Sequence, residues 1–344
     1  MKSDTAVKRC VSCTMSMTFP GISFNDVGLC GFCQEFPGIQ ELKDEQSRLK
    51  ELMEVEIENS KGKGDYDCIV AYSGGKDSTF TLMHLVQHYG LNCLAVTIDN
   101  DFMAPQTVKN CYKVTEKLGV DFILFKPSPN FMMNMYRESV KTGGVQTRAA
   151  VKRVSSICNS CINLINNYMI KLALMHNSPL VAGGYIGGQL PKNASMINLN
   201  LIQRESLKKP MFDQYKKLFG ATSTKFFFLR EELISGYGKN SITIINPMLT
   251  LPVGESEIIS RITELGWVKP LDTGANSSNC LVNDLGIAIH YKKHNFHAYE
   301  YEIAEQVRYG LMPREVGLKK VTEIPEFSQL STQMNKVGLK AEDI

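Results

Sequence analysis

The sequence predicts an α/β fold: a doubly wound parallel sheet with a small cysteine-rich segment before it and a mostly helical region after it. Short apolar runs alternate with helix-length amphipathic segments between residues 67 and 190. Such alternation is typical of parallel sheets. Two Cys-x-x-Cys pairs precede this region, and helical patterns and loops dominate from about residue 190.

Length and composition indicate a globular protein. The 344 residues suffice for one large domain or two ordinary ones, with 43% hydrophobic and 21% charged residues. We expect a cytoplasmic protein without a membrane partner, because no apolar run could span a bilayer and residues 1–9 are too polar for a signal peptide. A net charge of +3 neither requires nor excludes a nucleic-acid partner.

Residues 1–38 predict a zinc ribbon. Cys10 and Cys13 form one Cys-x-x-Cys pair, and Cys30 and Cys33 form a second pair sixteen residues later. Two such pairs can supply the four thiolates of a tetrahedral zinc site. The segment is too short for its own core, so metal binding would supply its folding energy. A redox role for either pair is the alternative.

Residues 39–66 predict a linker. An amphipathic helix is expected over 39–60, followed by the connector "SKGKGDYD". The apolar stripe of this helix comprises Leu42, Leu49, Leu52, Met53 and Ile57.

A phosphate-binding loop is predicted where the α/β region begins. The apolar run 68–71 forms a strand, and 78–88 has helical spacing. Gly74 and Gly75 between them allow a sharp turn and a close approach of backbone N–H groups to a ligand. The helix N-terminus attracts phosphate. Two hydroxyl groups and a cation add further donors, from Ser73, Ser78 and Lys76.

The residues Ser-Gly-Gly-Lys-Asp-Ser at 73–78 resemble the PP-loop of the ATP pyrophosphatases. The GTPase P-loop needs a different glycine spacing. The resemblance implies cleavage of ATP between its α and β phosphates and transfer of AMP to a substrate oxygen. Lys76 would then hold phosphates, and Asp77 is a candidate ligand for Mg²⁺. An ordinary strand-to-helix turn is the alternative.

Further strands and helices complete the predicted ATP-binding domain, residues 67–190. Strands are expected at 92–99, 121–127 and 179–184, with a helix at 107–118. Ligands bind at the carboxyl ends of such strands, so Asp99 would reach the adenosine half of ATP. Residues 191–344 would form the rest of the catalytic domain and a helical tail.

A second cysteine group is formed by Cys158, Cys161 and Cys280. A Cys-x-x-Cys at a helix start with a distant third cysteine resembles the 4Fe–4S-dependent PP-loop sulfurtransferases, the tRNA thiolation enzymes among them. That resemblance implies a cluster with one open iron that carries sulfide. The helix N-terminus should lower the thiol pKa values. The alternatives are a nucleophilic pair without iron, or plain buried cysteines.

The three remaining cysteines stand alone in apolar or helical contexts and are expected to be small buried residues. They are Cys68, Cys93 and Cys111.

The amino terminus resembles a different PP-loop family, the N-acetyl sugar amidotransferases of surface-polysaccharide biosynthesis. There a paired-cysteine segment carries Pro-Gly-Ile-x-Phe and then Gly-x-Cys-x-x-Cys, and "VRYGLMPRE" near the end is similar more loosely. The matching residues here are Pro20, Gly21, Ile22, Phe24, Gly28, Cys30 and Cys33.

Two basic groups could contact phosphate or a polyanion, although a solvated surface is the alternative for both. One comprises Arg148, Lys152 and Arg153. The other comprises His290, Lys292, Lys293, His294 and His297.

Together these features predict an enzyme that adenylates a carbonyl oxygen of its acceptor, after which a nucleophile displaces AMP. Sulfur is favoured because ammonia would leave Cys158, Cys161 and Cys280 without a task. The acceptor is a tRNA base, a sugar N-acetyl group or another small molecule. The partner is a sulfur donor, or a glutaminase in the ammonia alternative, and a homodimer is possible. A regulatory protein that has lost catalysis remains a different class.

Overall fold

The computed structural model describes residues 7–344 apart from 202, 204–212, 230 and 237–240. The described residues contain a six-stranded sheet in the order β3-β2-β1-β4-β6-β5. Neighbouring strands are parallel, except that β5 and β6 are antiparallel. The strands are β1 Cys68–Ala71, β2 Cys93–Ile98, β3 Asp121–Phe125, β4 Leu180–Ala182, β5 Met196–Leu199 and β6 Ile242–Ile245.

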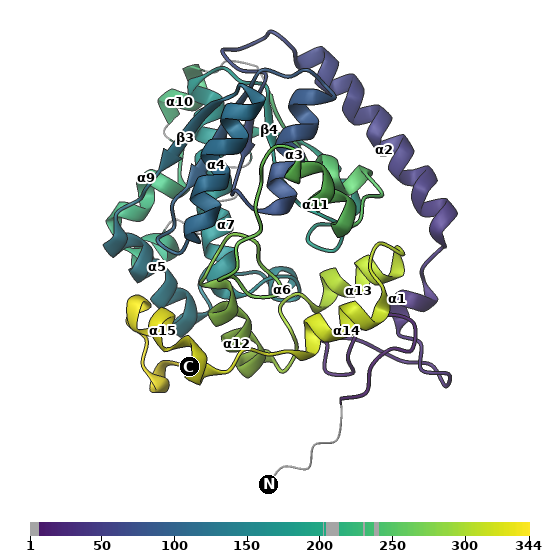
Figure 1. The fold of residues 1–344 in the computed structure, drawn as a ribbon. Coiled ribbons are helices and arrows are strands. Elements are labelled where there is room, and N and C mark those ends of the chain that lie inside the picture. The colour runs from purple at the N-terminus through teal and green to yellow at the C-terminus, as the bar shows by residue number, and fades with distance from the viewer. Residues whose placement is uncertain (1–6, 202, 204–212, 230, 237–240) are drawn as a thin grey trace.

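Helices cover the sheet and extend below its carboxyl edge (Figure 1). The helices before β4 are α1 Gly31–Gln34, α2 Ile39–Ser60, α3 Lys76–Gln87, α4 Pro105–Leu118, α5 Pro129–Thr142, α6 Arg148–Val151 and α7 Ser156–Met175. Those after it are α9 Thr224–Phe227, α10 Glu231–Gly236, α11 Glu255–Thr263, α12 Asn283–His294, α13 Glu300–Arg308, α14 Arg314–Thr322 and α15 Ser331–Val337.

Alternate side chains of β1 fill two cores, one on each face of the sheet. Ile69 packs on one face among residues of α5, α7 and α12. Cys68 and Val70 pack on the other face among residues of α2, α3 and α11. Cys93 and Cys111 lie in this second core and are buried, as the sequence predicts for all three isolated cysteines.

The position of β1 in the sheet indicates where a ligand crevice should lie. Its neighbours β2 and β4 lie on opposite sides, so the chain winds in both directions from this strand. In doubly wound sheets the crevice at such a switch point lies beyond the carboxyl ends of the strands. Residues 72–75, which follow β1, therefore open directly into the crevice.

The fold class predicted from the sequence is confirmed, with differences in detail. Helix α3 begins at Lys76, two residues earlier than expected, and Leu52 on α2 is 48% exposed rather than packed. Strands β5 and β6 lie where only helices and loops were expected. The β-branched run of β6 is only four residues long, and pairing with β4 stabilises it.

The cysteine-rich amino terminus lies against α13 and α14 at the foot of the molecule (Figure 1). Its buried residues share a small core with Phe296 and Ala304 from the carboxyl-terminal region. The rings of Phe19 and Phe296 are 5.1 Å apart and meet edge to face. This segment therefore depends on a partner surface as well as on its own residues. Among the described helices, none combines the length and apolarity needed to cross a membrane.

Candidate active site

The loop after β1 has the geometry that its two glycines predict. Gly74 has φ +72°, and a Cβ atom there would lie 2.6 Å from Cys111 Sγ and 3.0 Å from the Thr107 carbonyl oxygen. Only glycine fits this conformation and this space. The indole N–H of Trp267, the one tryptophan of the chain, donates to the Gly74 carbonyl oxygen at 3.0 Å. The loop is therefore held from outside as well as by its own turn.

Hydroxyl groups surround the backbone of the loop. Ser78 Oγ accepts from the Ser73 N–H at 3.1 Å and lies 2.9 Å from Ser73 Oγ. Ser278 Oγ accepts from the Lys76 N–H at 3.0 Å, although it lies 202 residues away in the sequence. The serines thus mark positions where phosphate oxygens could accept the same hydrogen bonds at the start of α3.

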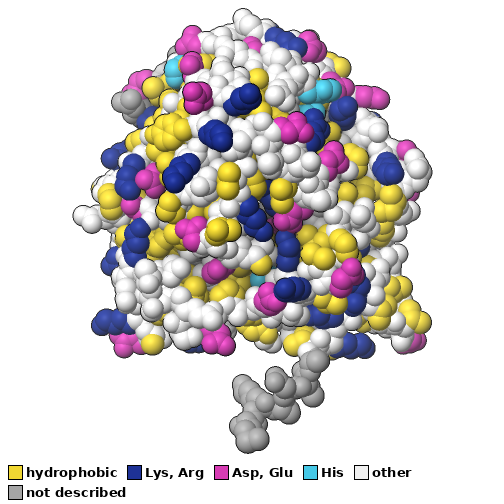
Figure 2. Space-filling view, viewed as in Figure 1, with side chains coloured by type: hydrophobic (Ala, Val, Ile, Leu, Met, Phe, Trp, Pro, Cys, Tyr) yellow, Lys and Arg dark blue, Asp and Glu magenta, His cyan; other side chains and the backbone are white. Residues whose placement is uncertain are grey.

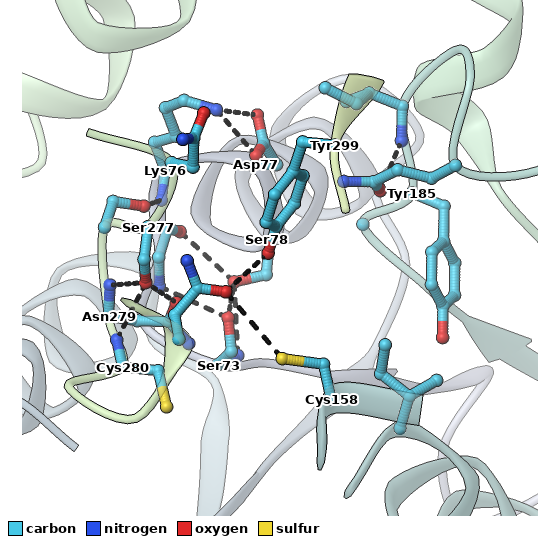
Figure 3. Close-up of a pocket in the computed structure, with 18 of the residues that line it drawn as sticks. Ser73, Lys76, Asp77, Ser78, Cys158, Tyr185, Ser277, Asn279, Cys280 and Tyr299 are labelled. Carbon is cyan, nitrogen blue, oxygen red and sulfur yellow. Dashed lines mark hydrogen bonds and ion pairs between the residues drawn. The ribbon is translucent and has the colours of Figure 1, made fainter. Parts of the chain in front are cut away.

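The charged residues of the loop pair with each other. Lys76 Nζ lies 2.7 Å from Asp77 Oδ2. Burial acts to lower the pKa of Lys76, but the charges of Asp77 and Glu255 outweigh burial and raise it. Lys76 therefore remains a cation that can bind phosphate. In Figure 3 the two side chains lie at one edge of the pocket.

The loop opens into a pocket of about 340 Å³. Its walls come from the ends of β1, β2 and β4, the first turns of α7, residues 275–283 and helix α13. Close packing holds these elements together: a Cβ atom on Gly184 would lie 2.8 Å from Ser78 Cα, and one on Gly188 would lie 2.4 Å from Glu302 Cα.

The structure brings Cys158, Cys161 and Cys280 to this pocket. Figure 3 shows Cys158 and Cys280 there. Cys158 and Cys161 occupy the first two turns of α7. The backbone of Cys280 pairs with that of Met103 in an isolated antiparallel β-bridge. The Cys280 N–H donates to Ser277 Oγ at 3.0 Å. Residues 277–286 therefore fold back to the loop after β1 and to the start of α7.

Amide side chains lie between the three sulfur atoms. Asn100 Nδ2 lies 3.4 Å from Cys280 Sγ and 3.9 Å from Cys161 Sγ. Cys158 Sγ lies 3.7 Å from Asn283 Oδ1. All three cysteines line the pocket, and the charge of each would act on the others.

The expectation of acidic thiols in this group is wrong. Burial raises the pKa of Cys158 to about 12 and that of Cys161 to about 11, and it also raises the pKa of Cys280. Removal of the charged form from water outweighs the helix N-terminus. The free thiols therefore stay protonated near neutral pH, and a bound cation would be needed to hold them as thiolates.

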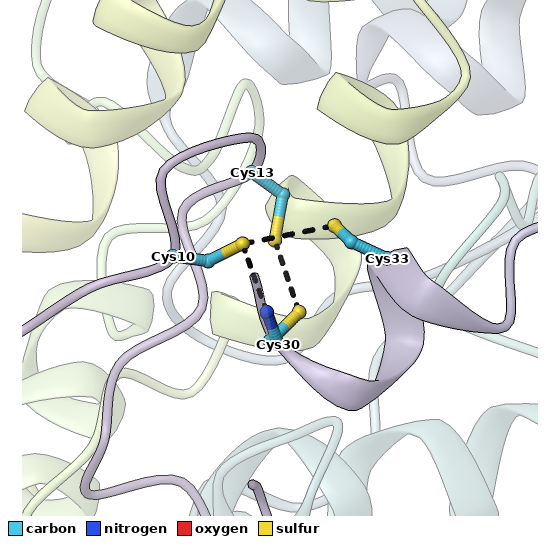
Figure 4. A group of neighbouring side chains, drawn as sticks. All are labelled: Cys10, Cys13, Cys30 and Cys33. Carbon is cyan, nitrogen blue, oxygen red and sulfur yellow. Dashed lines mark hydrogen bonds between the residues drawn. The ribbon is translucent and has the colours of Figure 1, made fainter. Parts of the chain in front are cut away.

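The four cysteines of the amino terminus form a compact group (Figure 4). All four sulfur atoms lie within 4.8 Å of one another. Backbone N–H groups donate to two of them, from Met15 to Cys13 Sγ at 3.5 Å and from Cys30 to Cys10 Sγ at 3.3 Å. Four convergent thiols with N–H donors are the ligand set of a tetrahedral thiophilic cation.

Two arginines tie this group to the carboxyl-terminal helices. Arg308 Nη1 on α13 lies 3.6 Å from Cys13 Sγ. Arg314 on α14 donates to the Cys13 and Cys10 carbonyl oxygens at 3.0 and 2.7 Å. Helix α13 therefore contacts the amino-terminal cysteines and also lines the pocket.

Asp99 does not belong to the described lining of the pocket, whereas its neighbour Asn100 does. The Asp99 carboxylate pairs with Lys126 Nζ at 3.0 Å and accepts from the Asp101 N–H at 2.9 Å. A contact between Asp99 and the adenosine of ATP therefore stays a prediction that needs this pairing to open.

Only part of the histidine-rich stretch is exposed: Lys292, Lys293 and His294 lie at the surface, whereas His290 and His297 are buried. A contact of the exposed part with a polyanion stays a prediction. Burial lowers the pKa of His290 and of His297 to about 3, so both rings are neutral. Arg153 is engaged internally, because its guanidinium lies 4.2 Å from the Tyr301 ring centroid and donates to the Gly188 carbonyl oxygen.

Sequence reasoning missed several residues of the pocket: Tyr185, Trp267, Ser278, Asn283, Tyr299 and Glu302. Burial raises the pKa of Glu302 to about 7, and its Oε2 atom is buried without a hydrogen-bond partner. The run "SSNC" before α12 is the one local signal that could have pointed to Ser278. The others lack a motif.

No known protein-family profile matches the chain. An uncharacterized protein of Methanocaldococcus jannaschii is 25% identical over 291 residues, which cover 85% of either chain.

Similar solved structures include an NMN synthetase from Francisella tularensis, at 16% identity and a TM-score of 0.39, covering 83% of this chain and 99% of that one. An NH3-dependent NAD synthetase from Campylobacter jejuni has 13% identity and a TM-score of 0.31, covering 58% and 92%. The U34-tRNA thiolase NcsA from Methanococcus maripaludis, with its 4Fe–4S cluster, has 14% identity and a TM-score of 0.34, covering 96% and 95%. Likenesses of this size do not assign a function, which has to come from the chain's own residues.

Proposed function

We propose that this protein is an ATP-dependent, AMP-forming transferase that activates a carbonyl oxygen of its acceptor and replaces it with sulfur. The observation that carries the proposal is one pocket lined by both the Ser73–Ser78 loop and three cysteines. An enzyme that first activates and then substitutes the same atom needs both sets of groups within reach of it.

The loop residues would bind and orient ATP. The N-terminal N–H groups of α3 and the Lys76 ammonium bind phosphate oxygens, while Asp77 is placed to hold Mg²⁺ beside the departing pyrophosphate. The Lys76–Asp77 ion pair would then open to take up the nucleotide and the metal ion. Trp267 and Ser278 keep the loop in position during this exchange.

The three cysteines would hold a 4Fe–4S cluster. All three cysteines line the pocket, and Asn100 contacts the sulfur atoms of two of them. Such a cluster, when bound, would supply an open iron that presents sulfide. Three protein thiolates leave that fourth position free.

The four-cysteine group would bind Zn²⁺ as a structural ion. Its compact ligand set and its contacts with α13 and α14 support a role in folding rather than in redox chemistry.

The alternative is an amidotransferase that uses ammonia in place of sulfur, with a sugar N-acetyl group as acceptor. The amino-terminal motif from Pro20 to Cys33 favours it. Figure 2 shows Lys and Arg side chains interspersed with Asp and Glu over the visible face, without a continuous basic field. A small neutral acceptor suits that face at least as well as a tRNA, so the acceptor has to be found by experiment.

The test combines metal analysis with pyrophosphate release. Protein purified without oxygen is analysed for iron, sulfide and zinc, then given ATP with tRNA or with an N-acetylated sugar nucleotide. We expect iron and sulfide in a cluster ratio, pyrophosphate release with one acceptor, and none from Lys76→Ala. Cys280→Ser should retain pyrophosphate release but form no thiolated product. Iron-free protein that releases pyrophosphate only when ammonia is supplied would establish the amidotransferase instead.

A further inference from the structure

Asn283, the first residue of α12, carries a buried polar atom without a partner. Its side chain is 3% exposed and lines the pocket. The Oδ1 atom accepts from the Tyr299 hydroxyl at 2.6 Å and lies 3.7 Å from Cys158 Sγ. The Nδ2 atom is buried and has no hydrogen-bond partner.

The Tyr299 hydroxyl sets which way the Asn283 amide faces. It donates to Oδ1 at 2.6 Å, whereas Cys158 Sγ lies at 3.7 Å from the same oxygen. Burial raises the pKa of Tyr299 far above its usual value, so this hydroxyl remains a donor. The amide nitrogen Nδ2 is therefore the atom without a hydrogen-bond partner.

A buried N–H group without an acceptor costs free energy, and proteins retain few of them. In a pocket, such a donor indicates a ligand oxygen. The phosphate-binding groups are Lys76, which pairs with Asp77, and the loop backbone, which Ser278 contacts. Beside Asn283 the lining is a thiol and a phenol, which suit a neutral oxygen rather than a phosphate.

We propose that Asn283 Nδ2 donates a hydrogen bond to a carbonyl oxygen of the acceptor, and that Tyr299 is the positioning residue that holds this amide. A carbonyl oxygen has two lone pairs, so one can accept from Asn283 while the other attacks the α-phosphate. The contact also places the carbonyl carbon beside Cys158. This inference rests on the proposed function only for the statement that the acceptor carries a carbonyl group.

Tyr299 is suited to positioning because it directly precedes α13. The carboxylate of Glu300 accepts from the Ser16 and His297 backbone N–H groups and pairs with Arg9 Nη1 at 3.3 Å. The start of α13 is thus fixed against the amino-terminal segment. Tyr299 is the residue next to Glu300, and its hydroxyl donates to Asn283 Oδ1.

Two alkylating probes test the donor. Iodoacetamide and iodomethane both react when a thiolate displaces iodide, but only iodoacetamide has a carbonyl oxygen beside the reacting carbon. Both probes react only with the Cys158 thiolate, so the ratio of their two rates does not depend on the fraction of Cys158 that is ionised. It is measured on the full-length protein by peptide mass spectrometry, after iron has been removed by a chelator where metal analysis finds it. The Cys280 ratio in the same sample is an internal reference.

We expect Asn283→Asp, which keeps the size and the Tyr299 contact but loses the donor, to lower the Cys158 ratio roughly fivefold, the worth of one hydrogen bond. Tyr299→Phe should lower it by a smaller factor, because the amide is no longer held. Asn166→Asp is the matched control. Asn166 lines the same pocket and accepts from Tyr185 Oη at 3.2 Å, but its amide nitrogen is not among the buried unpartnered atoms. Its ratio should equal that of the parent.

An unchanged Cys158 ratio in Asn283→Asp would overturn the proposal, as would a loss of ATP affinity, which would assign Nδ2 to the nucleotide. ATP affinity is read from the fluorescence of Trp267, which contacts the loop. If Asn283→Asp does not fold, the Cys158 rate ratio of Tyr299→Phe is the test, and an unchanged ratio would overturn the proposal. A failed search for pyrophosphate release would leave this probe result standing, so the two proposals fail separately.

Discussion

The two cysteine groups use the same side chain to build different kinds of site. In the amino-terminal group four sulfurs lie within 4.8 Å of one another, the distance over which they can share one ion. Within the described part of the chain, no other group of three or more metal-binding side chains is as compact. In the pocket, three cysteines line a larger space, and amide side chains contact their sulfur atoms. The first arrangement suits a single ion, and the second suits a larger guest.

The electrostatics of the two groups also differ. In the amino-terminal group, hydrogen bonding from Cys13 lowers the pKa of Cys33 to about 2, while the pKa of Cys13 itself rises far above its usual value. The proton distribution there depends on sulfur–sulfur contacts. In the pocket, burial dominates the pKa of every thiol. Contacts between sulfur atoms therefore set the thiol pKa values in the amino-terminal group, whereas exclusion of water sets them in the pocket.

The largest expected effect is on the amino-terminal group. Cys30→Ala should lose its metal ion and unfold residues 7–38, because structural zinc in small modules contributes about 10 kcal/mol of folding free energy. Zinc analysis and limited proteolysis would measure both changes. Cys280→Ser is the control, and it should keep zinc and resist proteolysis. If the two variants lost zinc and were proteolysed to the same extent, the two cysteine groups would not be separate sites.

The next effect concerns the loop and should leave both cysteine groups intact. Lys76→Ala removes the cation that binds phosphate, and AMP formation should fall by about 10² to 10³. Zinc and iron contents should match those of the parent. AMP formation at the parental rate would remove the PP-loop from the reaction.

A smaller effect on stability is expected in the pocket. Cys280→Ser should lower the free energy of unfolding by about 1 kcal/mol, since it replaces a partly buried thiol in a loop. Iron content and brown colour should nevertheless be lost together. Denaturant unfolding and anaerobic absorption spectra measure these two quantities. Retained colour in the variant would contradict a cluster that Cys280 helps to hold.

The smallest effect is a pH dependence that comes from two buried histidines, one on α12 and one just after it. The pKa of His290 and of His297 is about 3 in the folded protein and about 6.5 in the unfolded chain. The unfolded chain binds more protons between these values, so stability is lost as the pH falls below about 6.5. At pH 5.5 each histidine should cost about 1.4 kcal/mol.

Urea unfolding at pH 7.5 and 5.5 checks this expectation. His290→Phe should reduce the difference in unfolding free energy between the two pH values by about 1.4 kcal/mol. A difference that His290→Phe leaves unchanged would show that the ring is protonated in the folded state.

Local sequence determined much of this protein. Both Cys-x-x-Cys pairs, the strand–loop–helix around Ser73–Ser78 and the helix that begins near Cys158 were predictable, because each depends on neighbours a few residues away. The short strands β5 and β6 were not, since pairing across the sheet stabilises them.

Only the tertiary structure decided the composition of the pocket. Ser278 contacts Lys76 across 202 residues, and Asn283 lies beside Cys158 across 125. Asn283 and Tyr299 belong to no local motif, and their roles follow from burial and from which hydrogen bonds remain unmade. The tertiary structure likewise raised the thiol pKa values that the helix position alone would have lowered, because loss of water outweighs the field of a helix end. Spacing in the chain fixes which residues can meet nearby, whereas packing fixes what surrounds them.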